Sequence, residues 1–207
     1  MDKQYLTQQL MQFFDQYQAN INWDLYQTDI QVHMLNKGDC LLRQGERSAN
    51  MFFLCSGLVR YYSVSESGKE YTQTIAKSPR LVGSTRALTL SQPALFSIEA
   101  LRASTAISFP WQPFYQQMSQ DLAFTQAYAM FLESIFIHKE QKEHAMVKHS
   151  ATQRYLDFCR DFPELKDTLP QQQIASYIGI TPIALSRIRA QLRADQHSQK
   201  TQPKLRF

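Results

Sequence analysis

One segment near the C-terminus carries side chains suited to reading the base edges of DNA. If residues 182–193 are helical, one face presents Ile183, Ser186, Arg187 and Ala190. Arginine can contact guanine through two bonds, serine can reach a base or a phosphate, and isoleucine can touch a thymine methyl group. Arg189 and Arg193 lie slightly round the helix, where they would contact phosphates. The pattern predicts a major-groove reader, with a surface salt bridge as the alternative role of Arg187.

The residues before this segment predict the elements that position it. Apolar residues recur at the spacing of two short packed helices: Ile174, Ala175, Ile178, Leu185 and Ile188. Gly179 supplies the left-handed residue that ends the first helix. Thr181 caps the second helix, and Pro182 stands at its first position, where a missing N–H costs nothing. Two helices joined by a glycine-containing turn form a helix-turn-helix motif.

The positive charge of the chain gathers at the same end. Residues 1–150 contain 13 basic and 13 acidic residues, whereas residues 151–207 contain nine basic and five acidic ones. The whole formal net charge of +4 therefore lies in the C-terminal part, which ends in a polar basic tail from Asp195 to Phe207. This distribution is typical of a DNA-binding module beside a neutral larger domain. A solvated basic tail is the alternative interpretation.

Other chemistries lack the residues that they need. Cys40, Cys55 and Cys159 are too scattered for a disulfide framework, a zinc ribbon or an iron–sulfur cluster. The chain contains neither HExxH nor His-x-His, and His138 and His144 lie six residues apart, on different faces of a helix. We therefore expect no catalytic residue, no metal site and no cofactor, and we predict that the chain is not an enzyme.

The N-terminus and the hydropathy pattern bear on location. The chain begins with polar residues that run directly into an amphipathic pattern, and it has no stretch of about 18 apolar residues. Scattered cysteines fit a reducing compartment. These features predict a cytoplasmic protein with no membrane partner.

The middle of the chain has the pattern of a β domain. Five of the six glycines fall between residues 38 and 83. Short apolar or aromatic runs occupy residues 40–42, 51–54, 58–62, 71–75, 96–101 and 105–109. Strands of this length, with turn signals about every ten residues, are typical of an antiparallel sandwich or barrel. Ser67-Gly68 predicts a hairpin turn between two of these strands.

Helical periodicity flanks the β region. Apolar residues recur at helical spacing from Tyr5 to Tyr17, and residues 118–148 contain neither Gly nor Pro. The second helix carries two neighbouring apolar stripes, of which the first is Phe124, Tyr128, Phe131 and Ile135 and the second is Leu122, Ala129, Leu132 and Phe136. Their joint face is too wide for one packing partner. We expect a dimer interface that includes the first stripe; the core helix of a monomer is the alternative.

The order of β region, long helix and helix-turn-helix motif resembles the Crp/Fnr family of bacterial transcription regulators over essentially the whole chain. Five motifs are similar to the family's cyclic-nucleotide-binding jelly roll: Lys37-Gly38-Asp39, Gln44-Gly45-Glu46, Phe52-Phe53, Gly57-Leu58-Val59-Arg60 and Gly68-Lys69-Glu70. Residues 150–156 resemble the start of its DNA-binding domain. Residues 174–182 with 185–189 closely match its helix-turn-helix motif.

The resemblance also locates a candidate effector site. Family members that bind cyclic AMP hold the ribose with a Gly-Glu pair, and the phosphate with an Arg-Ser pair and backbone amides. This sequence has Gly83-Ser84 and Ala94-Leu95 instead, so we do not expect cyclic AMP as the effector. The effector-binding candidates are Gly83, Ser84, Thr85 and Arg86. Arg86 would attract an anion at a helix N-terminus, with a solvated surface arginine as the alternative.

The recognition helix departs from the family as well. Ile183 stands where many relatives carry Glu, so the resemblance does not predict the familiar half-site. Isoleucine cannot hydrogen-bond cytosine or adenine.

We therefore expect an α+β fold with three parts. These are a jelly-roll sensor domain at residues 1–117, a long dimerisation helix at 118–148 and a helix-turn-helix domain, winged or plain, at 149–207. The residues expected to contact DNA are Thr181, Ile183, Ser186, Arg187, Arg189 and Arg193. The expected function is transcription regulation by a homodimer that reads a two-fold DNA site, under control of an effector other than cyclic AMP.

The resemblance implies four partners: double-stranded DNA, a second copy of the chain, RNA polymerase and a small-molecule effector. The alternative function is a sensor module that acts through protein–protein contacts, without specific DNA binding.

Overall fold

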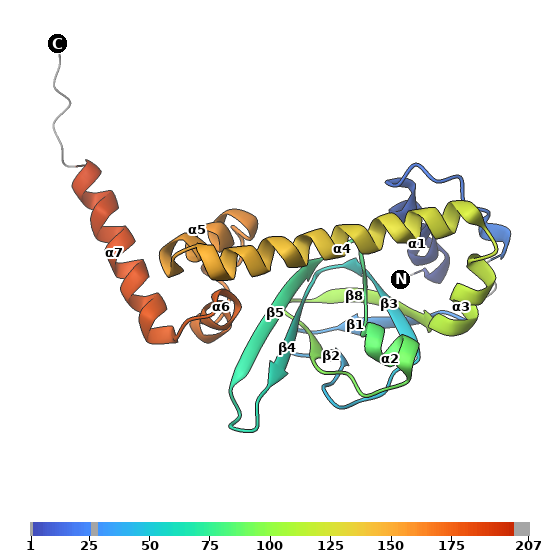
Figure 1. Cartoon of the computed structure of the whole chain (residues 1–207), viewed down its shortest axis with the longest axis horizontal. Helices are drawn as coiled ribbons and strands as arrows, with labels where there is room; N and C mark the ends of the chain where they lie inside the picture. The colour runs from blue at the N-terminus through green and yellow to red at the C-terminus, as the bar shows by residue number, and fades with distance from the viewer. Residues whose placement is uncertain (1, 26–28, 201–207) are drawn as a thin grey trace, which may run out of the picture. The chain divides into compact units, whose positions relative to one another are not determined.

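The computed structural model describes residues 2–25 and 29–200, with side chains described as far as Asp195. The rest of the predicted tail, residues 201–207, lies outside the described residues. The chain divides into two compact units, Met1–Glu140 and Gln141–Phe207. The division falls inside the long helix α4, Leu122–Lys148 (Figure 1). The boundary therefore lies within the predicted dimerisation helix and not at either of its ends.

The N-terminal unit contains two four-stranded antiparallel sheets, which confirms the predicted jelly roll. The first has the order β1-β8-β3-β6, with strands Gln31–Leu35, Ser104–Pro110, Asn50–Ser56 and Arg80–Val82. The second has the order β2-β7-β4-β5, with strands Cys40–Leu42, Ser97–Ala100, Leu58–Val64 and Glu70–Lys77. Leu54, Val59 and Ile98 come from both sheets and are completely buried in one cluster, so the core lies between the sheets.

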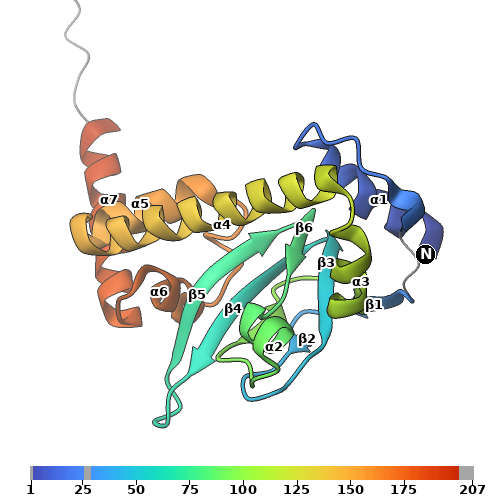
Figure 2. The same ribbon diagram turned by 45° about the vertical axis from the view of Figure 1, so that its right-hand side comes forward.

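The β4–β5 hairpin confirms the turn that Ser67-Gly68 predicts. Val64 pairs with Glu70, and the Ser65 N–H donates to the Lys69 carbonyl oxygen over 2.9 Å. Gly68 has φ +78°, a conformation that glycine adopts without steric cost. The hairpin projects from the roll in both ribbon views (Figures 1 and 2).

Helices of the same unit cover one sheet. These are α1 (Lys3–Asp15), the 3-10 turn η1 (Trp23–Leu25), α3 (Trp111–Met118) and the start of α4; the short helix α2 spans Thr85–Leu90. Phe13 of α1 lies 5.5 Å from Phe53 of β3 and 5.7 Å from Phe131 of α4, measured between ring centroids. Phe14 lies 5.5 Å from Phe124 in the same measure. These aromatic contacts make α1, β3 and α4 parts of one core.

The two apolar stripes of α4 have different environments, and this bears on the predicted dimer interface, which stays a prediction. Phe124 and Phe131 are only 0% and 4% exposed because α1, α3 and the sheet cover them, and Tyr128 and Ile135 are partly buried beside that core. The second stripe faces solvent, with Leu122 70% and Phe136 64% exposed. The first stripe thus belongs to the core of the single chain, and the second is the one open to a partner.

The long helix also starts later than the sequence predicts. Met118 ends α3, and a turn at residues 119–121 separates it from α4. The Asp121 carboxylate accepts the Ala123 N–H over 2.8 Å and so caps α4. The break has no Gly or Pro to mark it, so the sequence pattern runs through it.

The C-terminal unit has three helices after α4: α5 (Ala151–Asp161), α6 (Gln171–Ile178) and α7 (Pro182–Lys200). Phe158, Ile174, Ile178 and Leu185 are its most buried large side chains. Within the described part of the chain no strand follows Pro110, so α6 and α7 form a plain helix-turn-helix motif without a wing.

Candidate nucleic-acid interface

The turn between α6 and α7 is built as the sequence predicts. Gly179 has φ +73°, and the Ile180 N–H reaches the Ala175 carbonyl oxygen over 2.9 Å, which satisfies a terminal carbonyl of α6. The Thr181 hydroxyl accepts the Ala184 N–H over 3.2 Å, and Pro182 opens α7. Thr181 is thus a helix cap, and its hydroxyl is already engaged within the protein.

Packing fixes which face of α7 points outward. Leu185 is completely buried, as are Ile174 and Ala175 of α6. The Gln171 side chain adds a polar tie, because its Nε2 donates to the Pro182 carbonyl oxygen over 3.0 Å. These contacts leave the opposite face of the first turns of α7 at the surface.

That outward face carries the residues predicted to read bases. Ile183 is 67% exposed, and Ser186 and Arg187 are also exposed. Because they are three and four residues after Ile183, they lie on the same side of the helix. The surface combines a methyl-contacting side chain, a hydroxyl and a guanidinium, as a major-groove reader requires.

Arg189 has a different environment from the one the sequence predicts. Its Nε donates to the Tyr155 hydroxyl over 3.0 Å, and its Nη2 donates to the Lys166 carbonyl oxygen over 2.6 Å. The guanidinium is therefore directed toward α5 and the loop after it, not outward to a phosphate. Arg193 is exposed, with its Nε 3.2 Å from the Arg189 carbonyl oxygen. No local sequence pattern indicates the Tyr155 contact, which joins residues 34 positions apart.

In the candidate effector site of the β roll, the polar groups of Gly83 and Ser84 are already hydrogen-bonded within the chain. The Gly83 N–H donates to the Tyr61 hydroxyl oxygen over 3.2 Å. Ser84 is 2% exposed, and its hydroxyl caps α2 by accepting the Ala87 N–H over 3.4 Å. Sequence reasoning missed Tyr61, because its partner lies on a distant strand.

The neighbouring residues Ala94 and Tyr61 are also engaged in contacts within the β roll. Ala94 is 2% exposed, and its backbone is bonded to the loop before β3 through Gly45 and Glu46, each over 2.8 Å. The Tyr61 ring packs 5.1 Å from Phe96 between centroids, and burial raises the pKa of the Tyr61 phenol. Thr85 and Arg86 are exposed, and α2 has only six residues.

Cys40 and Cys55 have no activated environment. Burial raises the pKa of the Cys55 thiol to about 12, and burial also raises that of Cys40. A thiol with a raised pKa stays protonated and is a weak nucleophile. Among the described residues, no group of three or more His, Cys, Asp or Glu side chains is placed to hold a metal ion.

Comparisons with known proteins agree with this architecture. Residues 32–121 match the cyclic nucleotide-binding domain family. Transcriptional activator protein anr of Pseudomonas aeruginosa is 24% identical over 166 residues, which cover 74% of this chain and 67% of that relative.

Two solved structures have a similar fold. FixK2 from Bradyrhizobium japonicum aligns with a TM-score of 0.69 at 14% identity, covering 81% of this chain and 86% of that one. The c-di-GMP responsive global regulator CLP from Xanthomonas campestris aligns with a TM-score of 0.66 at 14% identity, covering 84% and 90%. None of the described helices is long and apolar enough to cross a membrane.

Proposed function

We propose that this chain, which belongs to the Crp/Fnr family of transcription regulators, binds a two-fold DNA site as a homodimer through the first turns of α7. The observation that carries the proposal is the exposed array of Ile183, Ser186 and Arg187 on a helix whose other face is buried against α6. Exposed side chains of these types do not contribute to a hydrophobic core, but they suit contacts with base edges in a major groove.

Roles within the array follow from side-chain chemistry. Arg187 donates two bonds to the O6 and N7 atoms of a guanine, Ser186 bonds a base or a phosphate, and Ile183 contacts a thymine methyl group. Arg193, one turn further along α7, contacts phosphates and therefore contributes affinity rather than specificity. Arg189 positions α7 from inside the protein.

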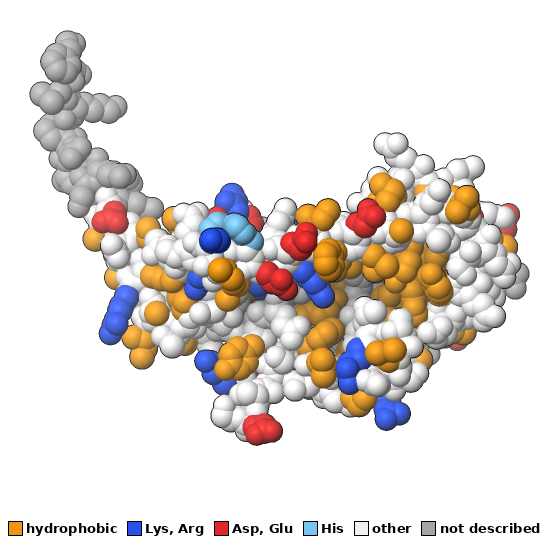
Figure 3. Space-filling model, viewed as in Figure 1, with side chains coloured by type: hydrophobic (Ala, Val, Ile, Leu, Met, Phe, Trp, Pro, Cys, Tyr) orange, Lys and Arg blue, Asp and Glu red, His pale blue; other side chains and the backbone are white. Residues whose placement is uncertain are grey.

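Dimerisation uses the exposed stripe of α4. Leu122, Ala129 and Phe136 recur every seven residues, and Leu132, 42% exposed, lies beside them. Figure 3 shows hydrophobic and acidic side chains side by side along this helix. A surface apolar stripe on a 27-residue helix suits pairing with a second copy of the same helix. Two copies of α7 then occupy successive major grooves, about 34 Å apart.

Control by an effector does not use cyclic AMP in the usual way. The Gly83 N–H already donates a hydrogen bond to the Tyr61 hydroxyl, and Ser84 is buried. The sequence has no carboxylate or guanidinium side chain at Ser84 or at Ala94-Leu95. A nucleotide loses two charge-assisted contacts worth about 1.5–3 kcal/mol each. If another ligand binds the β roll, it acts by shifting the population of arrangements of the two α4 helices.

Selection of bound duplexes from a random pool tests the proposal. We expect a two-fold consensus with a guanine in each half-site, and an affinity that falls steeply with salt. The competing function, a sensor module acting through protein contacts, has the same motif as a docking surface. It predicts no enriched sequence and no salt-dependent binding to any duplex.

A further inference from the structure

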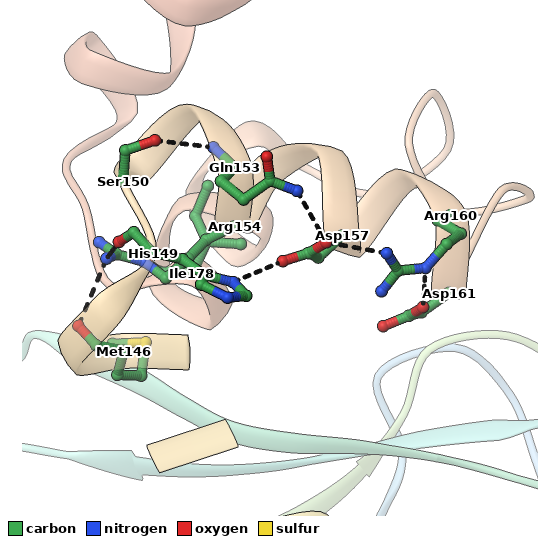
Figure 4. Close-up of polar contacts among 9 residues, drawn as sticks. All are labelled: Met146, His149, Ser150, Gln153, Arg154, Asp157, Arg160, Asp161 and Ile178. Atoms are coloured by element: carbon green, nitrogen blue, oxygen red, sulfur yellow. Dashed lines mark hydrogen bonds and ion pairs between the residues drawn. The ribbon is translucent and has the colours of Figure 1, made fainter. Parts of the chain in front are cut away.

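One arginine at the start of α5 contacts the ends of two other helices. Arg154 Nε donates to the Ile178 carbonyl oxygen over 2.8 Å. Its Nη1 donates to the His149 carbonyl oxygen over 2.7 Å and to that of Met146 over 3.4 Å (Figure 4). Ile178 is the last residue of α6, and Met146 and His149 lie at the end of α4, so one side chain joins three helices.

Two of the carbonyls that Arg154 binds, those of Met146 and Ile178, belong to the last turns of their helices and need an outside donor, whereas His149 follows the last residue of α4. The last four C=O groups of a helix have no partner within it, and they carry the negative end of the helix dipole. A planar guanidinium can serve several of them at once, whereas an ammonium is a single point charge. The contacts therefore satisfy two helix ends and bring them together.

Apolar and cationic side chains of α4 reinforce the same contact. The end of the Met146 side chain lies against Gly179, so a Cβ at that position would require the methionine to move. One turn earlier, Lys142 Nζ lies 3.8 Å from the centroid of the Tyr177 ring on α6. Lys142 and Met146 are four residues apart, so the same face of α4 meets α6 twice.

The connection between α4 and α5 is equally well bonded. The Ser150 hydroxyl caps α5 by accepting the Gln153 N–H over 3.2 Å. His149 Nδ1 lies 2.9 Å from the Asp157 carboxylate, which also accepts bonds from Gln153 and Arg160 (Figure 4). The His149 contact ties the residue after α4 to the middle of α5, while the bonds of Ser150, Gln153 and Arg160 order the start of α5 itself.

We propose that Arg154 is a positioning residue that locks the last two turns of α4, residues 141–148, to the helix-turn-helix motif, so that they move as one body. The unit boundary at Glu140 and Gln141 agrees with this, because it assigns these turns to the C-terminal unit. The joint between sensing and DNA reading then lies inside α4 and not at the α4–α5 connection. As far as it concerns DNA, the inference rests on the proposed function.

A consequence is that the α4–α5 connection adds no freedom of its own to the direction of α7. When two copies pair through the exposed stripe of α4, only the joint inside α4 can change the angle at which each recognition helix leaves the dimer. The dimer should then prefer one separation between half-sites. Without the lock, each recognition helix would reach a wider range of separations.

Hydrogen–deuterium exchange of the full chain tests the lock without DNA. We expect Arg154→Gln to speed exchange of the His149, Gly179 and Ile180 amides at least about tenfold, the loss expected when a charge-assisted bond is removed. Exchange in the β roll should not change. Arg160→Gln is the matched control, since Arg160 is on the same helix and pairs only with Asp157 and Asp161 in the contacts described. Equal exchange in Arg154→Gln and the unmodified chain would overturn the proposal.

Binding to duplexes whose half-site separation varies by one base pair tests the positioning role. The unmodified dimer and Arg160→Gln should lose at least about tenfold in affinity at the wrong separation. Arg154→Gln should discriminate less, while its affinity for a single half-site stays the same. Unchanged discrimination counts against the positioning role.

Two further arms keep the outcomes separate. Arg154→Lys keeps the positive charge but lacks the planar guanidinium that can donate to several carbonyls at once. It should give intermediate amide exchange and intermediate discrimination between half-site separations. It replaces Arg154→Gln if that variant does not fold. If the unmodified chain binds no duplex at all, the proposed function fails, and the exchange experiment still decides whether the lock exists.

Discussion

The two candidate sites differ in where their polar groups point. At the nucleotide position of the β roll, the Gly83 amide is bonded to Tyr61 and the Ser84 hydroxyl to its own helix. On α7, Ser186 and Arg187 are exposed, while Leu185 on the other face is completely buried. In the β roll, these hydrogen-bonding groups are bonded within the chain. On α7, the side chains of Ser186 and Arg187 lie at the surface, where a partner could reach them.

If cyclic nucleotides do not bind, as we expect, then the fold of the family is kept here without its ligand. A β roll can keep its sheets and its turn while its own tyrosine takes the amide that a ligand would use. Under the proposed function, recognition concentrates on the helix-turn-helix motif. Four experiments test that contrast.

The largest effect is expected on α4, where one stripe faces inward and the other outward. Phe131→Glu places a charge in the aromatic core and should cost more than about 4 kcal/mol of unfolding free energy. Phe136→Glu changes an exposed side chain and should shift stability by less than about 0.5 kcal/mol, yet give monomers and lower operator affinity on the order of a hundredfold. Thermal unfolding and sedimentation measure the two effects.

A stable dimer of Phe136→Glu would place the interface elsewhere. Gln141→Glu, an exposed change on the same helix, is the control for added negative charge.

The next effect separates two arginines on α7. Arg187→Ala should cost about 1–3 kcal/mol of operator binding and relax the preference at one guanine per half-site, with no change in melting temperature. Arg189→Ala should lower the stability of the unit by about 1–3 kcal/mol, because the Tyr155 hydroxyl and the Lys166 carbonyl lose their donor. Arg193→Ala should weaken all sequences alike. Equal, sequence-independent losses for Arg187→Ala and Arg193→Ala would show that Arg187 does not read a base.

A smaller effect concerns the closed corner of the β roll. Tyr61→Phe removes the acceptor of the Gly83 N–H and should destabilise the protein by about 2 kcal/mol. Tyr71→Phe, an exposed change in the neighbouring hairpin, should have no effect. Calorimetric titration with cyclic AMP and cyclic GMP should show no micromolar binding to either the unmodified chain or Tyr61→Phe. Micromolar binding that also raises operator affinity would mean that the β roll forms a nucleotide-binding site near Gly83.

The smallest effect is a pH dependence in the C-terminal unit. Burial lowers the pKa of Lys142 to about 8, so the folded protein releases this proton at lower pH than the unfolded chain does. Stability therefore rises with pH above about 8, by about 1 kcal/mol between pH 7 and pH 9. Lys142→Met should lack this rise, whereas Lys139→Met, an exposed change, should keep it. Urea titrations at each pH measure the difference, and parallel curves for Lys142→Met and the unmodified chain would contradict it.

The features that the sequence predicts best are those set by local chemistry. Gly179, Thr181 and Pro182 define the turn of the helix-turn-helix motif within four residues, and Ser67-Gly68 defines the hairpin in the same way. Helical periodicity alone places Ile183 and Arg187 on the outward side. Their contact with DNA stays a prediction.

The features that the sequence does not predict depend on distant partners. The two stripes of α4 are equally apolar, and only the packing of Phe13 and Phe14 decides which one is buried. The bonds of Tyr61 to Gly83, and of Arg189 to Tyr155, join elements that no local pattern connects. Strands β1 and β6 are short and lack a strong alternating pattern, so they emerge only from pairing with β8 and β3.

The plain form of the helix-turn-helix motif has a consequence for how the protein responds to its own abundance. Under the proposed function, each copy brings the one helix α7 to the groove, since no strand of a wing follows α5 in the described residues. A single helix binds weakly, and useful occupancy comes from two helices acting together. While most chains are monomers, the number of dimers rises with the square of the chain concentration. Promoter occupancy should then respond steeply to expression level, which makes synthesis and degradation of the protein a means of control in themselves.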